Sequence, residues 1–133
     1  MEKCGFRCEK CKAVDRFDKD MTIFRFPKIL VIHLKRFQNS GRSRQKLSTS
    51  VSIPKTLDMS PYGPHSTHES KNYAKKYTLY GISHHSGTLN GGHYIGQVKD
   101  FDENKWYLCN DSSCSSSKGP DSSSSSAYVL FFI

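Results

Sequence analysis

A short run in the second half of the chain, Asn90–Tyr94, holds the residues best suited to chemistry. His93 lies within it, and an imidazole titrates near neutral pH, so it can act as a general base. Gly91 and Gly92 precede it and carry no Cβ atom, which lets a substrate chain approach the backbone closely. A single histidine is more often an ordinary surface or core residue, so this run needs a partner before it indicates a catalytic site.

A second polar run is expected to lie beside this histidine. The pattern of His93–Lys99 predicts a strand, Asp102–Asn104 a turn, and Lys105–Cys109 the returning strand. The two open ends of such a hairpin lie side by side, so His93 should meet the pair Asn110-Asp111. An amide or carboxylate at that place would fix the imidazole tautomer and stabilise the imidazolium ion. The spacing therefore favours a catalytic base with an orienting partner.

The elements that position this pair are mostly predicted strands. Met21–Leu34 gives the strongest signal, with Pro27 interrupting the ladder and an apolar stretch from Ile29 that predicts burial on both faces. His33 within this stretch is expected to be a buried core residue. Shorter strands are predicted at Leu47–Ile53, Tyr77–Ser83 and Tyr128–Ile133, loops at Gln38–Lys46 and His84–Gly92, and an irregular segment at Thr56–Lys71 with a helical turn near Leu57–Met59.

Serine dominates the segment 112–126, where Ser115–Ser117 and Ser122–Ser126 surround Lys118-Gly119-Pro120. Such a composition offers almost no apolar surface to a core. The sequence therefore predicts a flexible serine-rich loop between the hairpin and the last strand.

Composition sets outer limits on function. The chain has 133 residues, which suits one small domain or part of a larger one, and its formal net charge is +8. A basic patch could bind nucleic acid, but the positive residues are scattered, and a solvated surface is the simpler explanation. The longest apolar run, Ala127–Ile133, is too short for a membrane span, and no apolar leader follows Met1. We expect a cytoplasmic or nuclear protein with no membrane partner.

The chain has five cysteines. Cys8 and Cys11 form a Cys-x-x-Cys pair with Cys4 just before it, whereas Cys109 and Cys114 stand apart from these and from each other. In a reducing compartment a Cys-x-x-Cys pair indicates metal binding or redox chemistry rather than a structural disulfide.

Four segments of the chain, taken together and in this order, resemble the ubiquitin-specific protease (ubiquitin carboxyl-terminal hydrolase) family. The resemblance runs from about Phe6 to the end of the chain. Phe26–Phe37 resembles a core strand of that family, Ser86–Tyr94 its histidine box, Trp106–Ser113 the segment with the third triad member, and Ala127–Phe132 the closing strand.

The resemblance implies an α+β fold, that of a papain-like cysteine protease. This chain would be the C-terminal part of the catalytic domain, comprising a palm of mainly antiparallel β sheet (21–133) and part of the fingers (4–20). His93 would be the general base, Asn110 its orienting residue, and Asp111 an additional polar group or a substitute orienter. Two segments, Gln38–Lys46 and Ser83–Asn90, would flank the channel for the ubiquitin tail. The expected substrate contacts are Ser86, His85, Gly91, Gly92 and Tyr94.

The same resemblance shows what is missing. The family's nucleophilic cysteine lies in a glycine- and asparagine-rich box far upstream of the histidine, and this chain has no such box. Cys8 and Cys11 resemble half of a zinc-binding region, but structural zinc usually takes four ligands, so the site would be incomplete. Catalysis itself would need no cofactor.

Three functions follow as alternatives. The favoured one is a piece of an active enzyme that hydrolyses the bond after the C-terminal glycine of ubiquitin. Its partners would be ubiquitin, ubiquitinated proteins and the missing N-terminal half, and the chain alone would be inactive. The second is an inactive ubiquitin-binding relative. The third, a basic zinc or nucleic-acid module, explains the charge but leaves the histidine box without a purpose.

Overall fold

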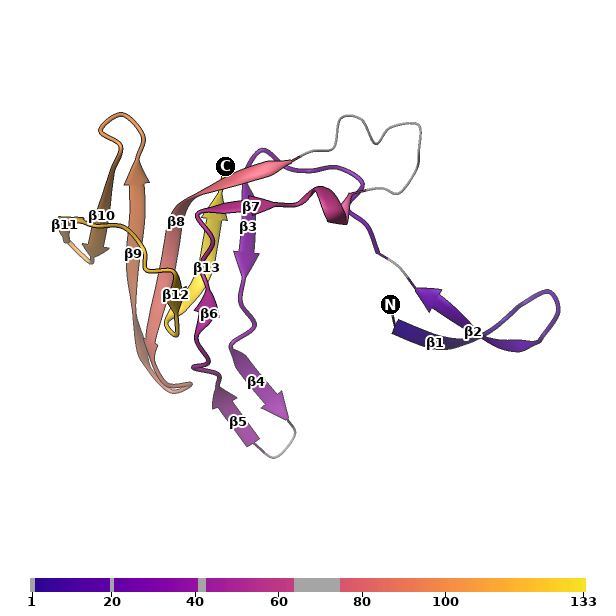
Figure 1. Cartoon of the computed structure of the whole chain (residues 1–133). Coiled ribbons are helices and arrows are strands. Elements are labelled where there is room, and N and C mark those ends of the chain that lie inside the picture. Colours follow the sequence, from indigo (N-terminus) through magenta and orange to yellow (C-terminus); the bar gives the residue numbers. More distant parts are fainter. Residues whose placement is uncertain (1, 20, 41–42, 64–74) are drawn as a thin grey trace.

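A seven-stranded antiparallel sheet dominates the computed structural model, which describes residues 2–19, 21–40, 43–63 and 75–133 (Figure 1). The strand order is β11-β10-β9-β8-β13-β3, and β7 pairs with the first part of β8. The strands are β3 (Leu30–His33), β7 (Thr56–Asp58), β8 (Lys76–Gly87), β9 (Gly92–Asp100), β10 (Lys105–Asn110), β11 (Ser113–Ser117) and β13 (Ala127–Phe132).

Three smaller antiparallel pairs accompany the main sheet. They are β1 (Glu2–Arg7) with β2 (Val14–Lys19), β4 (Phe37–Ser40) with β5 (Ser43–Lys46), and β6 (Val51–Ser52) with β12 (Ser123–Ser124). The described residues contain one 3-10 helix, η1 (Ser60–Tyr62), and no α-helix. The prediction of a mainly antiparallel sheet is therefore confirmed, while the helical part of an α+β fold has no counterpart in this described portion. No helix there is long and apolar enough to cross a membrane.

The core lies on one face of the sheet. Side chains of β8 and β13 point to this face, and shifts in the register between the two strands interrupt the simple alternation along them. Segment 51–55 packs over them, with the Ile53 amide donating to the carbonyl of Ser122 and the Leu79 amide to that of Lys55. The buried apolar side chains are Ile53, Tyr77, Leu79, Ile82, Ala127, Leu130 and Phe132.

The opposite face of the sheet is open. Val31 of β3 is 52% exposed, and Val98 and Phe101 are also exposed. The prediction that Ile29–Leu34 is buried on both faces is therefore wrong for this chain, because no described segment forms a layer over the second face. His33 is exposed as well, and its ring meets the Tyr128 ring edge-on at 4.6 Å.

Three predicted strands also differ in their bounds, and of the predicted strand Leu47–Ile53 only Val51–Ser52 forms a strand. Only Leu30–His33 of the predicted strand Met21–Leu34 pairs in the sheet, and the residues before Pro27 run separately, with the Ile23 amide bonded to the carbonyl of Tyr62. In contrast, β8 continues past Ser83 to Gly87, because its last residues keep pairing with β9. The predicted long loop before His93 is thus reduced to residues 88–91.

The serine-rich segment 112–126 forms regular structure instead of the predicted loop. It contains β11 and β12, and its hydroxyl groups satisfy main-chain and side-chain donors. The Ser117 hydroxyl accepts from Gln97 and from the Gly119 amide, both at 3.1 Å, and the Ser124 hydroxyl accepts from the Ala127 amide at 2.9 Å. Composition did not predict these strands, because short hydroxyl side chains can replace apolar packing with local hydrogen bonds.

Arg36 ties several segments of the fold together. Its guanidinium group is buried and donates to the carbonyl oxygens of Ala127, Leu47, Thr49 and Ser124 at 2.6, 3.0, 2.8 and 3.1 Å. A planar guanidinium offers five donors in a fixed fork, which suits several acceptors at once. Arg36 therefore fixes the irregular segment after β5 and the entrance to β13 against each other.

Replacing Arg36 with methionine should lower the free energy of unfolding by about 3–5 kcal/mol, because four buried or part-buried carbonyl groups would lose their donor. The loss of unfolding free energy for Arg36→Lys should be smaller than for Arg36→Met but not zero, since one ammonium group cannot reach all four acceptors. Urea unfolding followed by circular dichroism measures the change. The matched control is Lys35→Met at the exposed neighbouring position, and equal losses for Arg36→Met and Lys35→Met would contradict this role.

Candidate active site

His93 and Asn110 meet at adjacent ends of two paired strands. His93 is the second residue of β9, Asn110 is the last residue of β10, and the two strands pair from Lys105↔Asp100 to Cys109↔Gly96. The imidazole Nε2 lies 2.5 Å from the Asn110 Oδ1 atom. The structure thus brings together the two side chains that the hairpin pattern predicts as neighbours.

The contact selects one tautomer of the His93 ring. An amide oxygen only accepts hydrogen bonds, so Nε2 must carry the proton and donate it to Asn110. The lone pair then resides on Nδ1. The His93 side chain is 49% exposed, so the ring is accessible to a group that lies outside this chain.

Asp111 holds a different position. Its Oδ2 atom is 3.9 Å from His93 Nε2, its side chain is 81% exposed, and its backbone lies in the left-handed region at φ 49°. A carboxylate at this distance attracts the imidazolium ion without forming the direct hydrogen bond. The geometry therefore makes Asn110 the direct partner and leaves Asp111 as a nearby charge.

Three of the expected substrate contacts lie exposed around His93. Ser86 is the register partner of His93 across β8 and β9, and its hydroxyl donates to the His93 carbonyl at 3.4 Å. Gly91 has open space where a Cβ would be, and Tyr94 is 52% exposed. These positions are accessible to a chain that approaches the histidine.

His85 is placed differently from its prediction as a loop residue. It lies inside β8, is 4% exposed, and its ring packs against Tyr94 at 4.6 Å and Phe37 at 5.4 Å. Its Nδ1 atom has no hydrogen-bond partner among the described residues. Burial lowers the pKa of His85, and the positive charge of Lys46 lowers it further. His85 therefore packs against neighbouring rings inside the sheet and presents little surface to a substrate.

Gly92 is required by this packing. A Cβ at Gly92 would overlap the imidazole Nε2 of His85 and the carbonyl oxygen of Ser86. The sequence suggested that both glycines admit a substrate, whereas the structure shows that Gly92 admits the buried ring of His85. Since Gly92 directly precedes His93, this close approach sets where β9 begins.

Lys46 is a contributor that the sequence analysis did not single out. Its ammonium group donates to the carbonyl oxygen of His85 at 2.7 Å and to that of Gly87 at 3.3 Å. A half-buried lysine at the end of a predicted loop gave no signal in the sequence, because its two acceptors are main-chain atoms some forty residues away. Lys46 thereby joins β5 to the strand that leads into the site.

A cleft of about 590 Å³ lies between these two parts of the chain. One wall comes from the end of β5 and the residue after Leu47, and the other from the turn that connects β8 to β9. Within this turn the Thr88 amide donates to the Gly91 carbonyl at 2.8 Å. The cleft thus borders the segment that enters His93. It is lined by Arg44, Gln45, Lys46, Ser48, Gly87, Thr88, Leu89 and Asn90.

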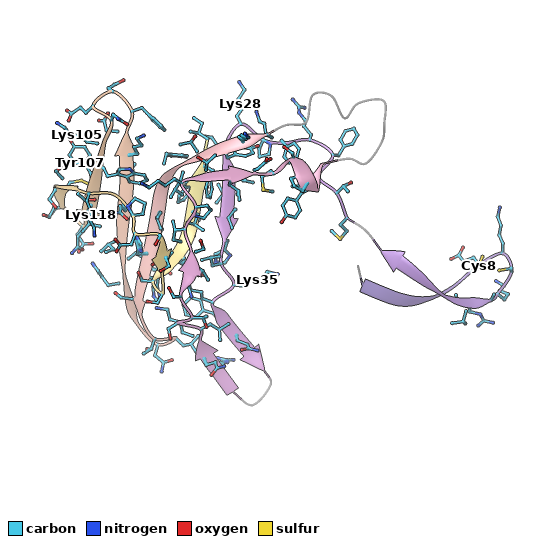
Figure 2. All side chains as sticks on the ribbon, viewed as in Figure 1. Cys8, Lys28, Lys35, Lys105, Tyr107 and Lys118 are labelled. Atoms are coloured by element: carbon cyan, nitrogen blue, oxygen red, sulfur yellow. A yellow bond between two sulfur atoms is a disulfide. The ribbon has the colours of Figure 1, made fainter. Side chains whose placement is uncertain are left out.

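Cys8 and Cys11 lie at the turn of the β1–β2 hairpin, and Figure 2 shows Cys8 at its tip. Both thiols are free, and hydrogen bonds from the backbone of Cys11 and Lys10 lower the pKa of Cys8. The described residues contain no group of three or more histidine, cysteine, aspartate or glutamate side chains that could hold a metal ion. Two thiols do not fit a four-ligand structural zinc site, so the described structure lends no support to zinc in this chain.

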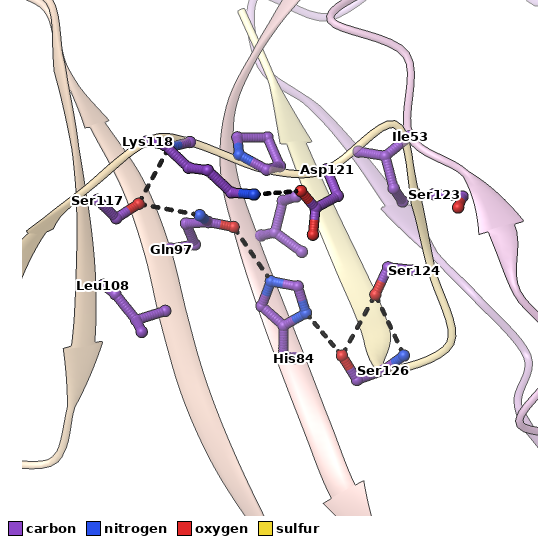
Figure 3. Close-up of a pocket in the computed structure, with 13 residues that line it drawn as sticks. Ile53, His84, Gln97, Leu108, Ser117, Lys118, Asp121, Ser123, Ser124 and Ser126 are labelled. Carbon is purple, nitrogen blue, oxygen red and sulfur yellow. Dashed lines mark hydrogen bonds and ion pairs between the residues drawn. The ribbon is translucent and has the colours of Figure 1, made fainter.

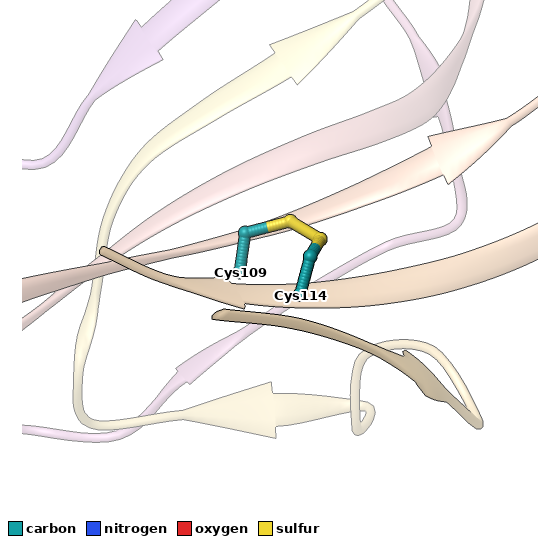
Figure 4. Close-up of a disulfide and its surroundings, with 2 residues drawn as sticks. All are labelled: Cys109 and Cys114. Atoms are coloured by element: carbon teal, nitrogen blue, oxygen red, sulfur yellow. A yellow bond between two sulfur atoms is a disulfide. The ribbon is translucent and has the colours of Figure 1, made fainter. Parts of the chain in front are cut away.

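The two cysteines that the sequence analysis treated as isolated form a disulfide. Cys109 of β10 and Cys114 of β11 face each other as register partners, with Cα atoms 4.2 Å apart (Figure 4). Their separation of five residues gave no signal, because pairing depends on the tight hairpin between them.

Comparison with known proteins adds to this geometry. The profile of the family described as ubiquitin carboxyl-terminal hydrolase matches residues 2–132. This chain belongs to that family. The prediction of family membership, made from the histidine box and its companion segments, is therefore confirmed.

Curated relatives agree with this membership. Ubiquitin carboxyl-terminal hydrolase 2 of Gallus gallus is 41% identical over 126 residues, which cover 94% of this chain and 34% of the relative. Ubiquitin carboxyl-terminal hydrolase 10 of Arabidopsis thaliana is 40% identical over 126 residues, which cover 94% of this chain and 13% of the relative. The chain thus spans 34% of the length of one of these family members and 13% of the other.

Solved structures share the fold. A chain in the SAGA Ubp8/Sgf11/Sus1/Sgf73 DUB module bound to ubiquitin aldehyde superposes with a TM-score of 0.79 at 30% identity, covering 99% of this chain and 30% of that chain. A chain of the SAGA DUB module bound to monoubiquitin gives a TM-score of 0.78 at 31% identity, with 99% and 29% coverage. The antiparallel sheet described above is therefore the arrangement found in solved deubiquitinase modules.

Behind the site of this ubiquitin carboxyl-terminal hydrolase chain, His84 links the sheet to the serine-rich segment (Figure 3). Its Nδ1 atom is 3.0 Å from the Ser126 hydroxyl and its Nε2 atom is 3.4 Å from the Gln97 Oε1 atom. These groups border a pocket of about 320 Å³ whose walls also include Leu108 and Pro120. Burial lowers the pKa of His84, and the hydrogen bond from its Nε2 to the Gln97 oxygen opposes part of this shift.

Gly92→Ala should lower the free energy of unfolding by about 1–3 kcal/mol, because the added methyl group overlaps His85 and the backbone of β8. It should also displace His93, which NMR signals of the imidazole would report. Gly91→Ala is the matched control, since no atom lies within 4 Å of its Cβ position. Equal behaviour of the two variants would contradict the packing role of Gly92.

Acidification should destabilise the fold through His84 and His85. Both pKa values are lowered in the folded state, so the unfolded chain binds protons first as the pH falls below the ordinary imidazole value of about 6.5. The stabilising contribution is complete above that value and is lost as the pH falls toward the lowered folded values. Urea midpoints measured between about pH 7.5 and pH 5 should decline, and His84→Gln should reduce the slope. An unchanged slope would exclude His84 as a contributor.

Proposed function

We propose that this chain supplies the general base and its orienting amide for hydrolysis of the bond after the C-terminal glycine of ubiquitin. The nucleophilic cysteine would come from a preceding half of the catalytic domain. The single observation that carries the proposal is the contact between His93 Nε2 and Asn110 Oδ1, with Nδ1 left to receive a proton. This arrangement stands in a chain of the ubiquitin carboxyl-terminal hydrolase family.

The described cysteines of the chain do not provide the nucleophile. Cys109 and Cys114 are joined in a disulfide, and Cys8 and Cys11 lie on the hairpin β1–β2, which forms a sheet of its own. A thiolate must be within hydrogen-bond reach of the base that activates it. The chain is therefore proposed to be inactive until a second segment brings a cysteine to His93.

The His93 tautomer with its proton on Nε2 would determine which nitrogen takes up a proton. His93 Nδ1 would take the proton of the incoming thiol, and the resulting imidazolium would be stabilised by the Asn110 oxygen and the Asp111 carboxylate. The thiolate would attack the carbonyl carbon of the C-terminal glycine of ubiquitin, and the same nitrogen would return the proton to the leaving amine. Water, deprotonated by the same imidazole, would then hydrolyse the thioester and release the ubiquitin carboxylate and the thiol. Each of these steps uses the base in the orientation that Asn110 fixes.

The cleft beside the histidine suits an extended peptide. The hairpin of β4 and β5 and the turn between β8 and β9 form its two walls, and they correspond to the two segments expected to flank the ubiquitin tail. Solved structures with this fold include one bound to ubiquitin aldehyde and one bound to monoubiquitin. These facts support ubiquitin as the ligand of the cleft. Gly91, Ser86 and Tyr94 do not line the cleft but are exposed in the strands that hold His93 and in the turn before it.

The experiment joins this chain to an N-terminal half that bears the cysteine box and follows release of a fluorophore from the ubiquitin C-terminus. The chain alone should give no turnover, and the mixture should be active. His93→Ala should reduce the rate of the mixture by about 10²–10⁴-fold, because the thiol loses its base. Asn110→Ala should cost less than His93→Ala, and Asp111→Ala less than Asn110→Ala, since Asp111 lies farther from Nε2.

Binding between the halves must first be equal for all variants, which sedimentation or titration calorimetry can establish. An active mixture that is indifferent to His93→Ala would overturn the assignment of the base. Association of the mixture with ubiquitin without turnover would instead support the alternative of an inactive ubiquitin-binding relative.

A further inference from the structure

The disulfide between Cys109 and Cys114 encloses the residue that orients His93. Only Asn110–Ser113 lie between the two cysteines, and Cys109 directly precedes Asn110 (Figure 4). The covalent ring therefore contains the whole turn that carries the Asn110 amide and the Asp111 carboxylate. Opening of this ring should alter the contact between Asn110 and His93, because Cys109 and Asn110 are consecutive residues.

We propose that Cys109 and Cys114 are positioning residues for His93, and that reduction of their disulfide by a thiol loosens the Asn110-Asp111 turn. This inference rests on the proposed function. It makes the orientation of the base dependent on the redox state of a pair that does not take part in the chemistry. Activity would then require the nucleophilic cysteine to be reduced and the Cys109–Cys114 disulfide to be closed. An oxidant would inactivate the nucleophile, whereas a reductant would open the disulfide.

The turn has few other constraints in the described structure. All residues from Asn110 to Ser113 are exposed, and β11 is the last strand of the sheet, where it pairs with β10 alone. Asp111 occupies a left-handed backbone conformation, which a non-glycine residue adopts less readily than other conformations. The side chains of Asn110 and Asp111 contact His93 itself. Asn110 and Ser113 also pair as the last residues of the β10–β11 ladder, and the disulfide joins the neighbouring pair, Cys109 and Cys114. The disulfide is accordingly the covalent restraint on where Asn110 points.

The strand below the turn is held independently. Lys105 to Cys109 pair with β9, and Trp106 to Asn110 pair with β11. Opening the disulfide should therefore leave the sheet intact and act locally on the four residues of the turn. A local effect separates this pair from a general stabilising disulfide, which would act through the unfolded chain.

The reduction step is an ordinary thiol–disulfide exchange. Cys114 is exposed and Cys109 is half-buried, so an external thiolate would attack the sulfur of Cys114 and release Cys109 as a thiolate, which takes up a proton. A second thiol then attacks the mixed disulfide. Two external thiols are oxidised to one disulfide, and Cys109 and Cys114 together gain two electrons and two protons. A dithiol such as dithiothreitol supplies both thiols in one molecule.

The experiment uses the full chain with Cys4, Cys8 and Cys11 changed to serine, so that one pair remains. Alkylation and mass spectrometry first establish that the pair is closed without reductant and open after dithiothreitol. NMR of ¹⁵N-labelled histidine should then show His93 protonated at Nε2 when closed and shifted toward a mixture of tautomers when open. Amide exchange of Asn110–Ser113 should quicken on opening, while the signals of exposed His33, on β3, should not move.

Cys109→Ser with Cys114→Ser is the matched variant. It should resemble the opened chain with or without dithiothreitol, and circular dichroism should show the same sheet content as the parent. When mixed with a separately reduced N-terminal half, the closed chain should be faster than this variant by up to about 10²-fold, the scale expected for a misplaced catalytic group.

Two results would overturn the inference. One is a pair that stays as two thiols without reductant under mildly oxidising buffer, and the other is a closed pair whose opening leaves the His93 signals unchanged. Failure of the proposed function looks different, because the mixture would then be inactive in both redox states while the NMR response of His93 to opening persists.

Discussion

The buried guanidinium group of Arg36 is the interaction on which the arrangement of the site depends. It reaches four main-chain acceptors in segments that are distant in sequence, and its own carbonyl accepts from the Leu47 amide at 2.7 Å. Fixing Leu47 also fixes the preceding residue, Lys46, whose ammonium holds the carbonyl groups of His85 and Gly87. A continuous path of polar contacts therefore runs from a buried cation to the strand that faces His93. No carboxylate pairs with Arg36 among the described residues, so its charge is distributed over carbonyl dipoles, which suits a group whose task is to connect segments.

The site itself is assembled from two hairpins that share β9. One hairpin, β8 with β9, sets the position of His93 through the close approach of Gly92 to the buried His85 ring. The other, β9 with β10, brings Asn110 to the same end of the sheet. Because both depend on strand register, a slip of one residue in either would turn the imidazole and the amide to opposite faces. The exposed location of the pair is consistent with a site completed by another segment, since a base that waits for its thiol must remain accessible.

The sequence predicted the parts of this arrangement that depend on local pattern. Alternation and turn residues were enough to predict the hairpin from His93 to Asn110, and with it the juxtaposition of the two side chains. The motifs were enough to predict the family. The errors concern contacts between distant residues. The burial of His85, the bond from Lys46 to two carbonyl groups, and the pairing of Cys109 with Cys114 depend on three-dimensional neighbours that no local period reveals. The serine-rich segment was misjudged for a related reason, because hydroxyl groups such as that of Ser117 find their partners only after the sheet has formed.

The last strand in the sheet order, β3, has a consequence for the isolated chain. Its inner side pairs with β13, and its outer row of amide and carbonyl groups pairs with no strand among the described residues, with Val31 exposed above it. An exposed edge of this kind is a template on which a strand of another molecule can add, and apolar side chains strengthen such pairing. Lys28 and Lys35 flank the strand at its two ends and are exposed, so two chains that approach edge to edge would bring like charges together. Salt would screen that repulsion, and solutions of the chain should therefore lose monomer more readily as ionic strength rises.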